Sequence, residues 1–193
     1  MAHVALGANL DDPTATMVGA VRALARLGRV GAVSSLWRTD PVGGPAGQPT
    51  YRNAVLLWRP GTAWATPPRA LAALLAIERA LGRERRDRWG PRRIDLDLLA
   101  WQPDGGGTAD GVASARGRGR LALPDLPHPR AFGRPFVLVP WSEVAPGWRH
   151  PRSGVTVGAA AAASSTGVWP VSAAERARWA AGGAAAGAGT AAR

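Results

Sequence analysis

The order of short apolar runs and helix-spaced segments over the first hundred residues limits the possible folds more than any other feature of the sequence. Short apolar runs bounded by turn residues predict strands, and apolar residues repeated three and four positions apart predict helices. The predicted strands cover residues 3–6, 30–37, 53–58 and 94–101, and the predicted helices cover residues 13–27 and 67–81. This β-α-β-β-α-β order predicts the α+β class, and within it a ferredoxin-like sandwich with helices on one face of an antiparallel sheet.

Cap and turn residues define two boundaries in this region. Asp12 and Pro13 predict the start of the first helix, because an Asp carboxylate can cap free backbone amides and proline suits the first helical position. Residues 40–49 are rich in proline and glycine and predict a long surface loop. Loops of this length in compact domains are often functional.

The second half of the chain has a weaker pattern. Residues 136–141 predict another strand, and residues 157–163 predict a short helix. Residues 102–120 contain three consecutive glycines and an alternating Arg-Gly run, which predict a flexible insertion. Residues 171–193 are rich in alanine and glycine. We expect this C-terminal extension to be a tail that is disordered from residue 180, because it offers little apolar surface to offset the entropy of ordering.

Composition excludes several classes of enzyme. All twenty-four basic residues are arginine, so the chain lacks the lysine of a Walker A phosphate loop or of a Schiff-base enzyme. The absence of cysteine excludes thiol nucleophiles, disulfides and iron–sulfur clusters, and three histidines argue against a multi-His metal site. The net charge of +11 is weak support for nucleic-acid binding, because the abundance of Ala, Gly, Arg and Pro is typical of a GC-rich genome.

The sequence shows neither of the usual membrane-targeting patterns. It has no uninterrupted apolar stretch of about 18 residues, and no basic region followed by a cleavage site near Met1. We therefore expect a soluble cytoplasmic protein.

Residues 82–99 hold the most informative cluster of charges. Alternation along a strand places Asp95 and Asp97 on one face, and such a pair is tolerated when a divalent cation or arginines neutralise it. Six arginines lie between Arg83 and Arg93. Mg²⁺ takes one or two carboxylates plus substrate phosphates, and guanidinium groups bind phosphate oxygens, so the cluster predicts a metal-bound polyphosphate. The alternative is that the two aspartates form salt bridges on a solvated sheet face beside an Arg-rich surface loop.

Together with residues elsewhere in the chain, this cluster resembles the 6-hydroxymethyl-7,8-dihydropterin pyrophosphokinase family, which moves diphosphate from ATP to a pterin alcohol in folate biosynthesis. The matching motifs are residues 5–10 (ALGANL), 48–54 (QPTYRNA), 82–85 (GRER), 89–92 (WGPR), 95–97 (DLD), 127–130 (PHPR) and 134–138 (RPFVL). The resemblance assigns residues 1–170 to a pterin pyrophosphokinase domain that acts on ATP and 6-hydroxymethyl-7,8-dihydropterin. We expect a monomer with no nucleic-acid and no membrane partner.

For ATP, the resemblance implies two Mg²⁺ ions that bridge the phosphates and are bound by Asp95 and Asp97. Metals and arginines stabilise the charge that builds on non-bridging oxygens when the β-phosphorus is attacked and AMP leaves. The implied catalytic residues are Arg83, Arg92, Asp97 and His128. The implied ATP-binding residues are Glu78, Arg83, Arg85, Trp89, Arg92, Leu98, His128 and Arg134.

For the pterin, the resemblance implies two stacking aromatic residues and one amide that reads the edge of the ring. Tyr51 and Phe136 are the aromatics and Asn53 is the amide. The implied pterin-binding residues are Thr39, Pro41, Val42, Tyr51, Asn53, Asp95 and Phe136.

Structural alternatives stay open for three of these residues. Phe136 begins an apolar run and can belong to the core, and His128 can be a structural loop residue. Glu78 falls on the apolar stripe of the second predicted helix, where an unpaired carboxylate is costly, so it needs a partner. That partner is either the nucleotide ribose, as the resemblance implies, or the other member of an intrahelical or core salt bridge.

Two other functions have less support. An RNA-recognition domain has the same element order and a basic charge, but it needs aromatic residues on its inner strands, and the first predicted strand has none. A homologue that binds nucleotide without turnover would not need the aspartates, arginines and His128 that this chain retains. The group that accepts the proton of the attacking hydroxyl is either Asp97 or a metal-bound or phosphate oxygen.

Overall fold

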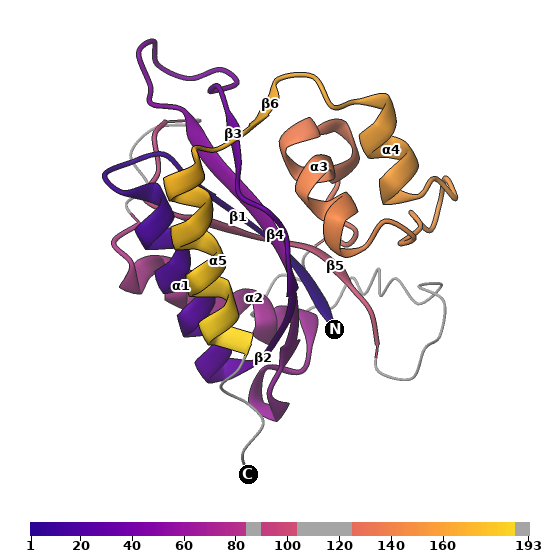
Figure 1. Ribbon diagram of the computed structural model, residues 1–193. Helices are drawn as coiled ribbons and strands as arrows, with labels where there is room; N and C mark the ends of the chain where they lie inside the picture. The colour runs from indigo at the N-terminus through magenta and orange to yellow at the C-terminus, as the bar shows by residue number, and fades with distance from the viewer. Residues whose placement is uncertain (84–89, 104–124, 188–193) are drawn as a thin grey trace.

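The computed structural model describes residues 1–83, 90–103 and 125–187, and within these ranges six strands form one antiparallel sheet (Figure 1). The strands are β1 (Ala2–Ala8), β2 (Gly28–Val33), β3 (Trp37–Thr39), β4 (Tyr51–Pro60), β5 (Asp95–Trp101) and β6 (Val168–Pro170). Their order is β5-β1-β4-β3-β6, and β2 pairs with a different stretch of β4. The α+β class and the antiparallel sheet are confirmed, and the ferredoxin-like topology stays a prediction.

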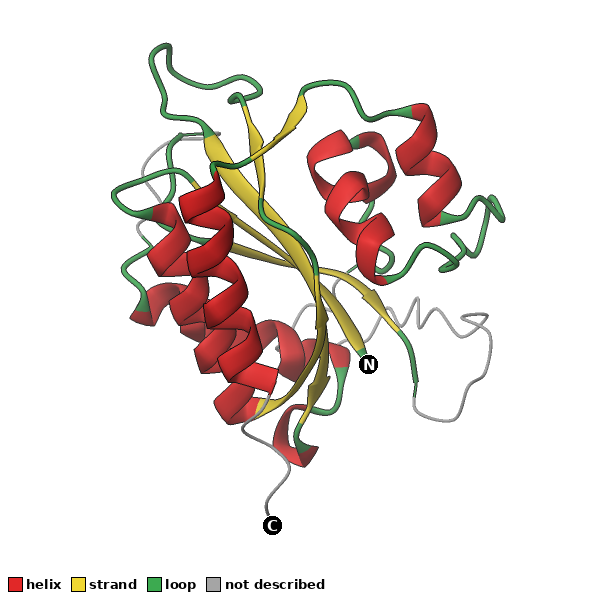
Figure 2. Cartoon of the chain, viewed as in Figure 1, coloured by secondary structure: helices red, strands yellow, loops and turns green. Residues whose placement is uncertain are grey.

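Helices cover both faces of this sheet (Figure 2). The helices are α1 (Pro13–Leu27), α2 (Pro67–Ala80), α3 (Pro135–Val144), α4 (Val157–Ala163) and α5 (Ala173–Gly187), with single 3₁₀ turns at η1 (Thr62–Trp64) and η2 (Ala131–Gly133). α1, α2 and α5 lie on one face, and α3 and α4 lie on the other. The prediction of helices on one face alone is wrong, because the strands bury apolar residues on both faces. None of the helices in the described ranges combines the length and apolar character that a membrane span needs.

Helices α1 and α2 begin where the sequence predicts. Asp12 Oδ1 accepts a hydrogen bond from the Ala15 amide at 3.0 Å, and Pro13 takes the first helical position. α2 begins at Pro67 and ends at Ala80. The α4 prediction is confirmed as well, at residues 157–163.

Alternation along the strands divides the apolar side chains between two cores. Leu6, Leu56 and Leu96 point to the first core, which α1, α2 and α5 cover. Ala5 and Val55 point to the second core, which α3 and α4 cover. Asp95 and Asp97 alternate with Leu96, so their side chains stand on the face of the second core.

The predicted strand at residues 136–141 is wrong, because these residues belong to helix α3. Pro135 occupies the first turn of this helix, and Val137, Leu138 and Trp141 bury one side of it against the sheet. A short, continuously apolar run fits either a buried strand or a buried helix, so periodicity alone could not separate the two.

The predicted strand at residues 30–37 is interrupted at Ser34. The Ser34 amide donates to Val55 O, and the Val55 amide donates to Ser34 Oγ, each at 2.9 Å. Glu143 of α3 then accepts hydrogen bonds from the Ser35 amide at 2.7 Å and from Trp37 Nε1 at 2.6 Å. These contacts divide the segment into β2 and β3.

The predicted disorder from residue 180 is also wrong as far as residue 187, because α5 continues through it. α5 packs along α1, and its Trp179 is buried and donates from Nε1 to Ser34 O at 2.8 Å. One large aromatic side chain therefore supplies the apolar surface that an Ala/Gly-rich segment otherwise lacks. Most of the predicted flexible insertion at 102–120, from residue 104 onward, lies outside the described residues. Residues 188–193 of the predicted tail lie outside them as well.

His3 is buried beside two aromatic rings of the second core. Its Nδ1 accepts a hydrogen bond from Trp141 Nε1 at 2.8 Å, and its ring packs edge-on against Trp141 and tilted against Trp148. Burial, together with the nearby N-terminal charge, lowers the pKa of His3 from 6.5 to about 4. The native protein therefore holds His3 neutral.

We expect this histidine to make the protein less stable in mild acid. Between pH 6.5 and 4 the unfolded chain binds a proton that the native state excludes, so stability is full above pH 6.5 and falls as the pH drops. At pH 5 the loss is about 2 kcal/mol. The free energy of unfolding is measured by urea denaturation at pH 7 and pH 5, and His3→Gln is the control because it lacks the titrating imidazole. An equal loss of stability in both proteins would contradict the assignment.

Candidate functional site

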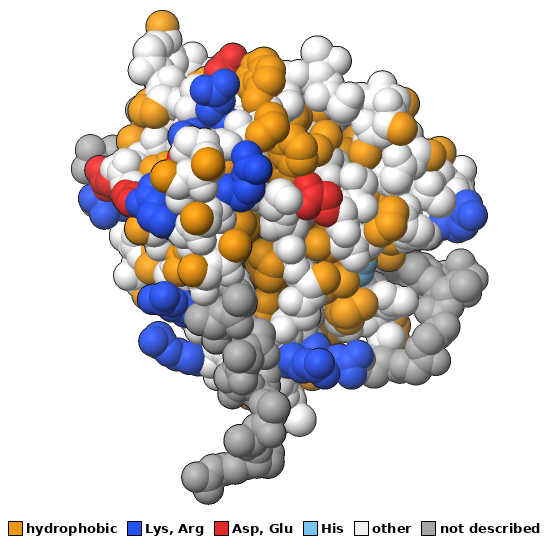
Figure 3. Space-filling view, in the orientation of Figure 1, with side chains coloured by type: hydrophobic (Ala, Val, Ile, Leu, Met, Phe, Trp, Pro, Cys, Tyr) orange, Lys and Arg blue, Asp and Glu red, His pale blue; other side chains and the backbone are white. Residues whose placement is uncertain are grey.

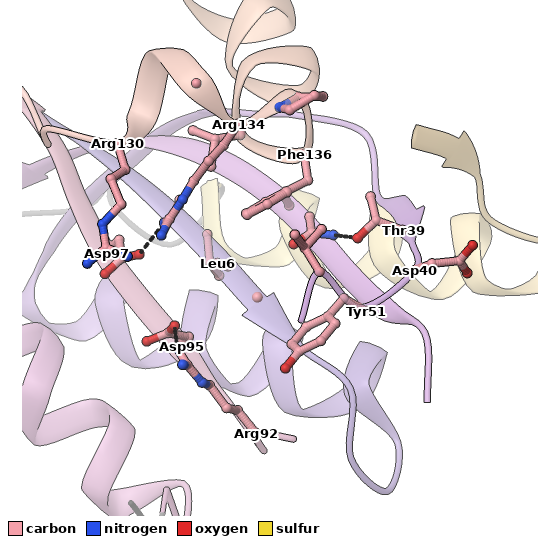
Figure 4. A pocket seen from close by; sticks show the side chains of 18 of the residues that line it. Leu6, Thr39, Asp40, Tyr51, Arg92, Asp95, Asp97, Arg130, Arg134 and Phe136 are labelled. Carbon is pink, nitrogen blue, oxygen red and sulfur yellow. Dashed lines mark hydrogen bonds and ion pairs between the residues drawn. The ribbon is translucent and has the colours of Figure 1, made fainter. Parts of the chain in front are cut away.

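A cavity of about 450 Å³ opens on the sheet face that carries α3, beside the N-terminus of that helix (Figure 4). The β1 residues Ala5 and Gly7 form its floor, and their small size leaves the space open. Gly7 pairs with Asn53 of β4 on one side and with Asp95 of β5 on the other. One row across the sheet therefore carries an amide, a residue without a side chain, and a carboxylate.

One end of the cavity is mainly apolar and aromatic. The side chains of Tyr51 and Phe136 extend into it from β4 and α3 (Figure 4). Tyr51 Oη donates to Gly90 O at 3.1 Å, and burial raises the pKa of Tyr51, so it stays a neutral donor. Phe136 lies 5.6 Å from the guanidinium carbon of Arg134, measured to the ring centroid. Phe136 also packs against the second core, so the core alternative applies to it, and its predicted contact with the pterin stays a prediction.

Thr39 and Asn53 form the polar part of the same end. Asn53 is buried, and its Nδ2 donates to Thr39 Oγ1 at 2.9 Å. This bond leaves Asn53 Oδ1 on the Gly7 side. Of the two predicted loop residues, Val42 lines the cavity and is 79% exposed, whereas Pro41 is not among the lining residues.

The other end of the cavity is charged. Asp95 accepts from Arg83 at 2.7 Å and also pairs with Arg92. Asp97 is 3.9 Å from Arg134. The salt bridges that the sequence left open as an alternative are thus present, but they lie in a cavity and not on an open sheet face.

The two aspartates have the electrostatics of a cation site. Burial raises the pKa of Asp97, and the charge of Asp95 raises it further, while His128, Arg134 and Arg83 oppose the shift. The described residues contain no group of three or more His, Asp or Glu side chains that could hold a metal ion. A cation at this pair would take its other ligands from phosphate and water, which suits Mg²⁺.

His128 lies behind the charged end and does not line the cavity. Its amide donates to Leu99 O at 2.8 Å, and its Nδ1 accepts from the Arg130 amide at 3.2 Å, so Nε2 carries the proton of the neutral ring. Burial lowers the pKa of His128, opposed by the charge of Asp97. His128 is therefore a neutral hydrogen-bond donor beside Asp97.

Glu78 forms the core salt bridge that the sequence left open as an alternative. It is 2% exposed, accepts from the Leu96 amide at 2.7 Å and pairs with Arg83. Burial raises the pKa of Glu78, and the hydrogen bond from Leu96 and the charge of Arg83 oppose this. Glu78 thereby fixes the start of β5 and the position of Arg83.

Three other predicted ATP-binding residues have no described place at the cavity. Leu98 is buried in the first core. Arg85 and Trp89 lie outside the described residues.

Two site residues escaped the sequence analysis. Asn9 Oδ1 accepts from the Arg92 amide at 2.7 Å, and its Nδ2 donates to Pro49 O at 3.0 Å, so Asn9 ties the loop before β5 to the loop before β4. Arg130 lines the cavity, and Figure 4 shows its side chain extending with that of Arg134 toward Asp97. Both lie in the matching motifs, which was the signal available for them.

Comparisons with known proteins identify relatives with one name. The model of the 7,8-dihydro-6-hydroxymethylpterin-pyrophosphokinase family matches residues 3–146. Three proteins named 2-amino-4-hydroxy-6-hydroxymethyldihydropteridine pyrophosphokinase are similar to the chain. The protein of Synechocystis sp. is 38% identical over 173 residues, which is 88% of this chain and 80% of the relative. The protein of Pseudomonas aeruginosa is 40% identical over 153 residues, or 77% and 83%. The protein of Mycobacterium tuberculosis is 36% identical over 143 residues, or 74% and 71%. The chain belongs to the 7,8-dihydro-6-hydroxymethylpterin-pyrophosphokinase family.

Proposed function

We propose that the cavity binds the pterin at its aromatic end and the ATP phosphates at its charged end. The family gives the reaction, transfer of diphosphate from ATP to the hydroxymethyl group of hydroxymethyldihydropterin in folate biosynthesis. The main support for this placement is the row of paired residues Asn53, Gly7 and Asp95 across the sheet. Two strand spacings, about 10 Å, separate its ends. A bicyclic ring with its hydroxymethyl group can fill this span, so a ring held at Asn53 presents its alcohol to the aspartates.

The pterin end offers stacking and one directional acceptor. Because Asn53 Nδ2 is bound to Thr39, its Oδ1 is oriented to accept from N–H groups on the pterin edge. Tyr51 and Phe136 supply aromatic surface on different walls. Flat heteroaromatic ligands are held by such stacking together with a few placed polar groups.

The charged end offers cation ligands and phosphate ligands together. Asp95 and Asp97 would hold Mg²⁺, and the resemblance supports two ions. When bound, Mg²⁺ neutralises charge on the phosphate oxygens. Arg83 and Arg92 are paired with Asp95 in the structure, and phosphate oxygens would give both arginines another partner once the aspartate binds a cation.

The chemistry follows from this placement. The hydroxymethyl oxygen attacks the β-phosphorus, the bond from that phosphorus to the α-bridging oxygen breaks, and AMP leaves with that oxygen. The hydroxyl proton is released. Arg92, Arg130 and Arg134 surround this end of the cavity and would donate to the phosphate oxygens on which charge develops.

We also propose a cytoplasmic monomer without a nucleic-acid partner. The described residues of β1, β4, β5 and α3 line the cavity within one chain, so a second copy is not needed to form it. On the face seen in Figure 3, the arginines form several separate groups among neutral and apolar side chains, not one continuous basic surface. Scattered charge of this kind does not favour the track that nucleic-acid backbones need.

Release of AMP tests the proposed function directly. Purified protein is incubated with MgATP, with and without 6-hydroxymethyl-7,8-dihydropterin, and the pterin diphosphate is detected by mass. We expect AMP only with the pterin, in step with the diphosphate product. Binding of both substrates without AMP at any Mg²⁺ concentration would overturn the proposed activity, and AMP release without the pterin would overturn the proposed acceptor.

A further inference from the structure

The segment that follows the family match, from residue 147 onward, contacts the strands that form the pterin end of the cavity. The family model ends at residue 146, and β6 and α5 follow it. β6 pairs with β3, so that Val168 lies opposite Thr39 and Trp169 opposite Arg38. Figure 1 shows β6 along the outer edge of the sheet and α5 on the face opposite α3. This segment therefore contacts the strands that carry Thr39, Tyr51 and Asn53 without lining the cavity itself.

β6 completes the hydrogen bonding of a very short strand. β3 has three residues, and β4 alone would pair only one of its edges. With β6 on the other edge, Thr39 is held between two strands and is 5% exposed. Thr39 in turn accepts the hydrogen bond that orients Asn53. The position of the Asn53 amide therefore depends on a strand contributed by the C-terminal segment.

Arg52 links α5 to the strand residues of the pterin end. It lies between Tyr51 and Asn53, so its side chain points to the opposite face of the sheet. Its Nε donates to Glu175 Oε1 at 2.7 Å, and its Nη1 donates to Thr50 Oγ1 at 2.8 Å. One guanidinium thus joins the first turn of α5 to the end of the loop that precedes Tyr51. The two charged side chains are 16% and 18% exposed, so water screens their contact only in part.

Glu175 is itself held in a fixed orientation. Its Oε2 accepts from Ser172 Oγ at 2.9 Å and from the Ser172 amide at 3.3 Å, and the Glu175 amide donates to Ser172 Oγ at 3.3 Å. This is a capping box at the start of α5. Burial raises the pKa of Glu175, but the hydrogen bonds from Arg52 and Ser172 outweigh this effect and hold the pKa below its ordinary value. Glu175 is therefore an ionised, oriented acceptor for Arg52 at neutral pH.

We propose that Glu175 is a positioning residue for the pterin, acting through Arg52 on Tyr51 and Asn53. The inference rests on the proposed function, because it assumes that the pterin binds at these two residues. A charge-assisted hydrogen bond to Arg52 restricts the start of β4, where the aromatic ring and the amide must be placed before the ligand arrives. ATP binds at the other end of the cavity and does not depend on this contact.

The test compares Glu175→Gln with Arg178→Gln. Arg178 lies on the same helix and forms an ion pair of the same length, 2.7 Å, with Asp12, but this pair is exposed and joins α5 to the N-cap of α1 instead of to β4. We expect Glu175→Gln to raise the Kd and KM for the pterin about three- to tenfold, with the Kd for MgATP and the urea midpoint changed no more than in Arg178→Gln. Pterin binding is measured by equilibrium fluorescence, so that turnover is not needed.

A double-mutant cycle with Arg52→Gln separates positioning from general loosening. If Glu175 acts through Arg52, the double variant binds the pterin no more weakly than Arg52→Gln alone. Additive losses, or equal losses for pterin and MgATP, would overturn the inference. Failure of the proposed function looks different, because wild-type protein would then show no pterin binding or no pterin-dependent AMP release before any variant is made.

Discussion

Replacing Asp97 by Asn is expected to lower the rate of diphosphate transfer by about a thousandfold or more, because the amide cannot act as an anionic metal ligand. Asp97 is the better of the two aspartates for this test. Asp95 accepts from Arg83 and Arg92, so its replacement would also release two arginines, whereas Asp97 forms a distant ion pair of 3.9 Å with Arg134. Asn has the same shape as Asp, so the cavity keeps its volume.

The pterin affinity of Asp97→Asn shows whether the substitution removes only the bound cation or also disrupts the pterin-binding end of the cavity. Asp97 lies on β5, opposite Ala5, and the predicted stacking and amide contacts to the pterin lie on β4 and α3. We therefore expect Asp97→Asn to leave the pterin Kd within about twofold of wild type, since the stacking and amide contacts to the ring are kept. The rate is measured as AMP release at saturating pterin and ATP over a range of Mg²⁺ concentrations.

Asp125→Asn is the matched control, because it removes one carboxylate from an exposed position outside the cavity. Its turnover should equal that of the wild type. If Asp97→Asn retained turnover within about tenfold of wild type, the assignment of a metal ligand would be wrong, because the loss of one transition-state contact alone costs about a hundredfold.

Features that depend on local pattern could be predicted from the sequence. α1 and α2 have apolar residues at helical spacing, and proline at their first positions. The alternation of Asp95, Leu96 and Asp97 correctly places both carboxylates on one face of β5. Strand alternation is a property of the backbone, so it needs no knowledge of the rest of the fold.

Features that depend on distant contacts could not be predicted in the same way. The apolar position of Glu78 indicated that it needs a partner, but not that the partners are Arg83 and the Leu96 amide. Asn9 and Arg92 are 83 residues apart, and no spacing rule connects a turn after the first strand to a loop before the fifth. The role of Asn9 therefore emerges only when both loops are placed at one edge of the sheet.

The C-terminal helix illustrates the limit of composition. An Ala/Gly-rich segment has little apolar surface on average, and the prediction of a disordered tail rested on that average. In α5, however, one large aromatic residue is buried. Trp179 is 3% exposed and reaches Ser34, which lies 145 residues away in sequence. The glycines then help, because Gly182 allows α5 to approach α1 closely. A Cβ at that position would lie 2.5 Å from Val18 Cγ2.

We therefore expect Trp179→Ala to destabilise the whole domain by about 3–5 kcal/mol. The substitution removes a buried indole and leaves the Ser34 carbonyl without its hydrogen-bond donor. The free energy of unfolding is measured by urea denaturation, followed by circular dichroism so that loss of α5 alone and loss of the whole sheet can be distinguished.

Trp169→Ala is the control, since it removes the same side chain from a position that is 40% exposed. Trp169 contacts Arg38 across the edge of the sheet, with 5.7 Å between the guanidinium carbon and the ring centroid, so its loss should cost about 1 kcal/mol or less. Equal costs for the two substitutions would mean that α5 does not pack on α1 as described. A large cost confined to Trp179 would show that the segment beyond the family match belongs to the folded domain, which is the condition for Glu175 to act on the pterin end of the cavity.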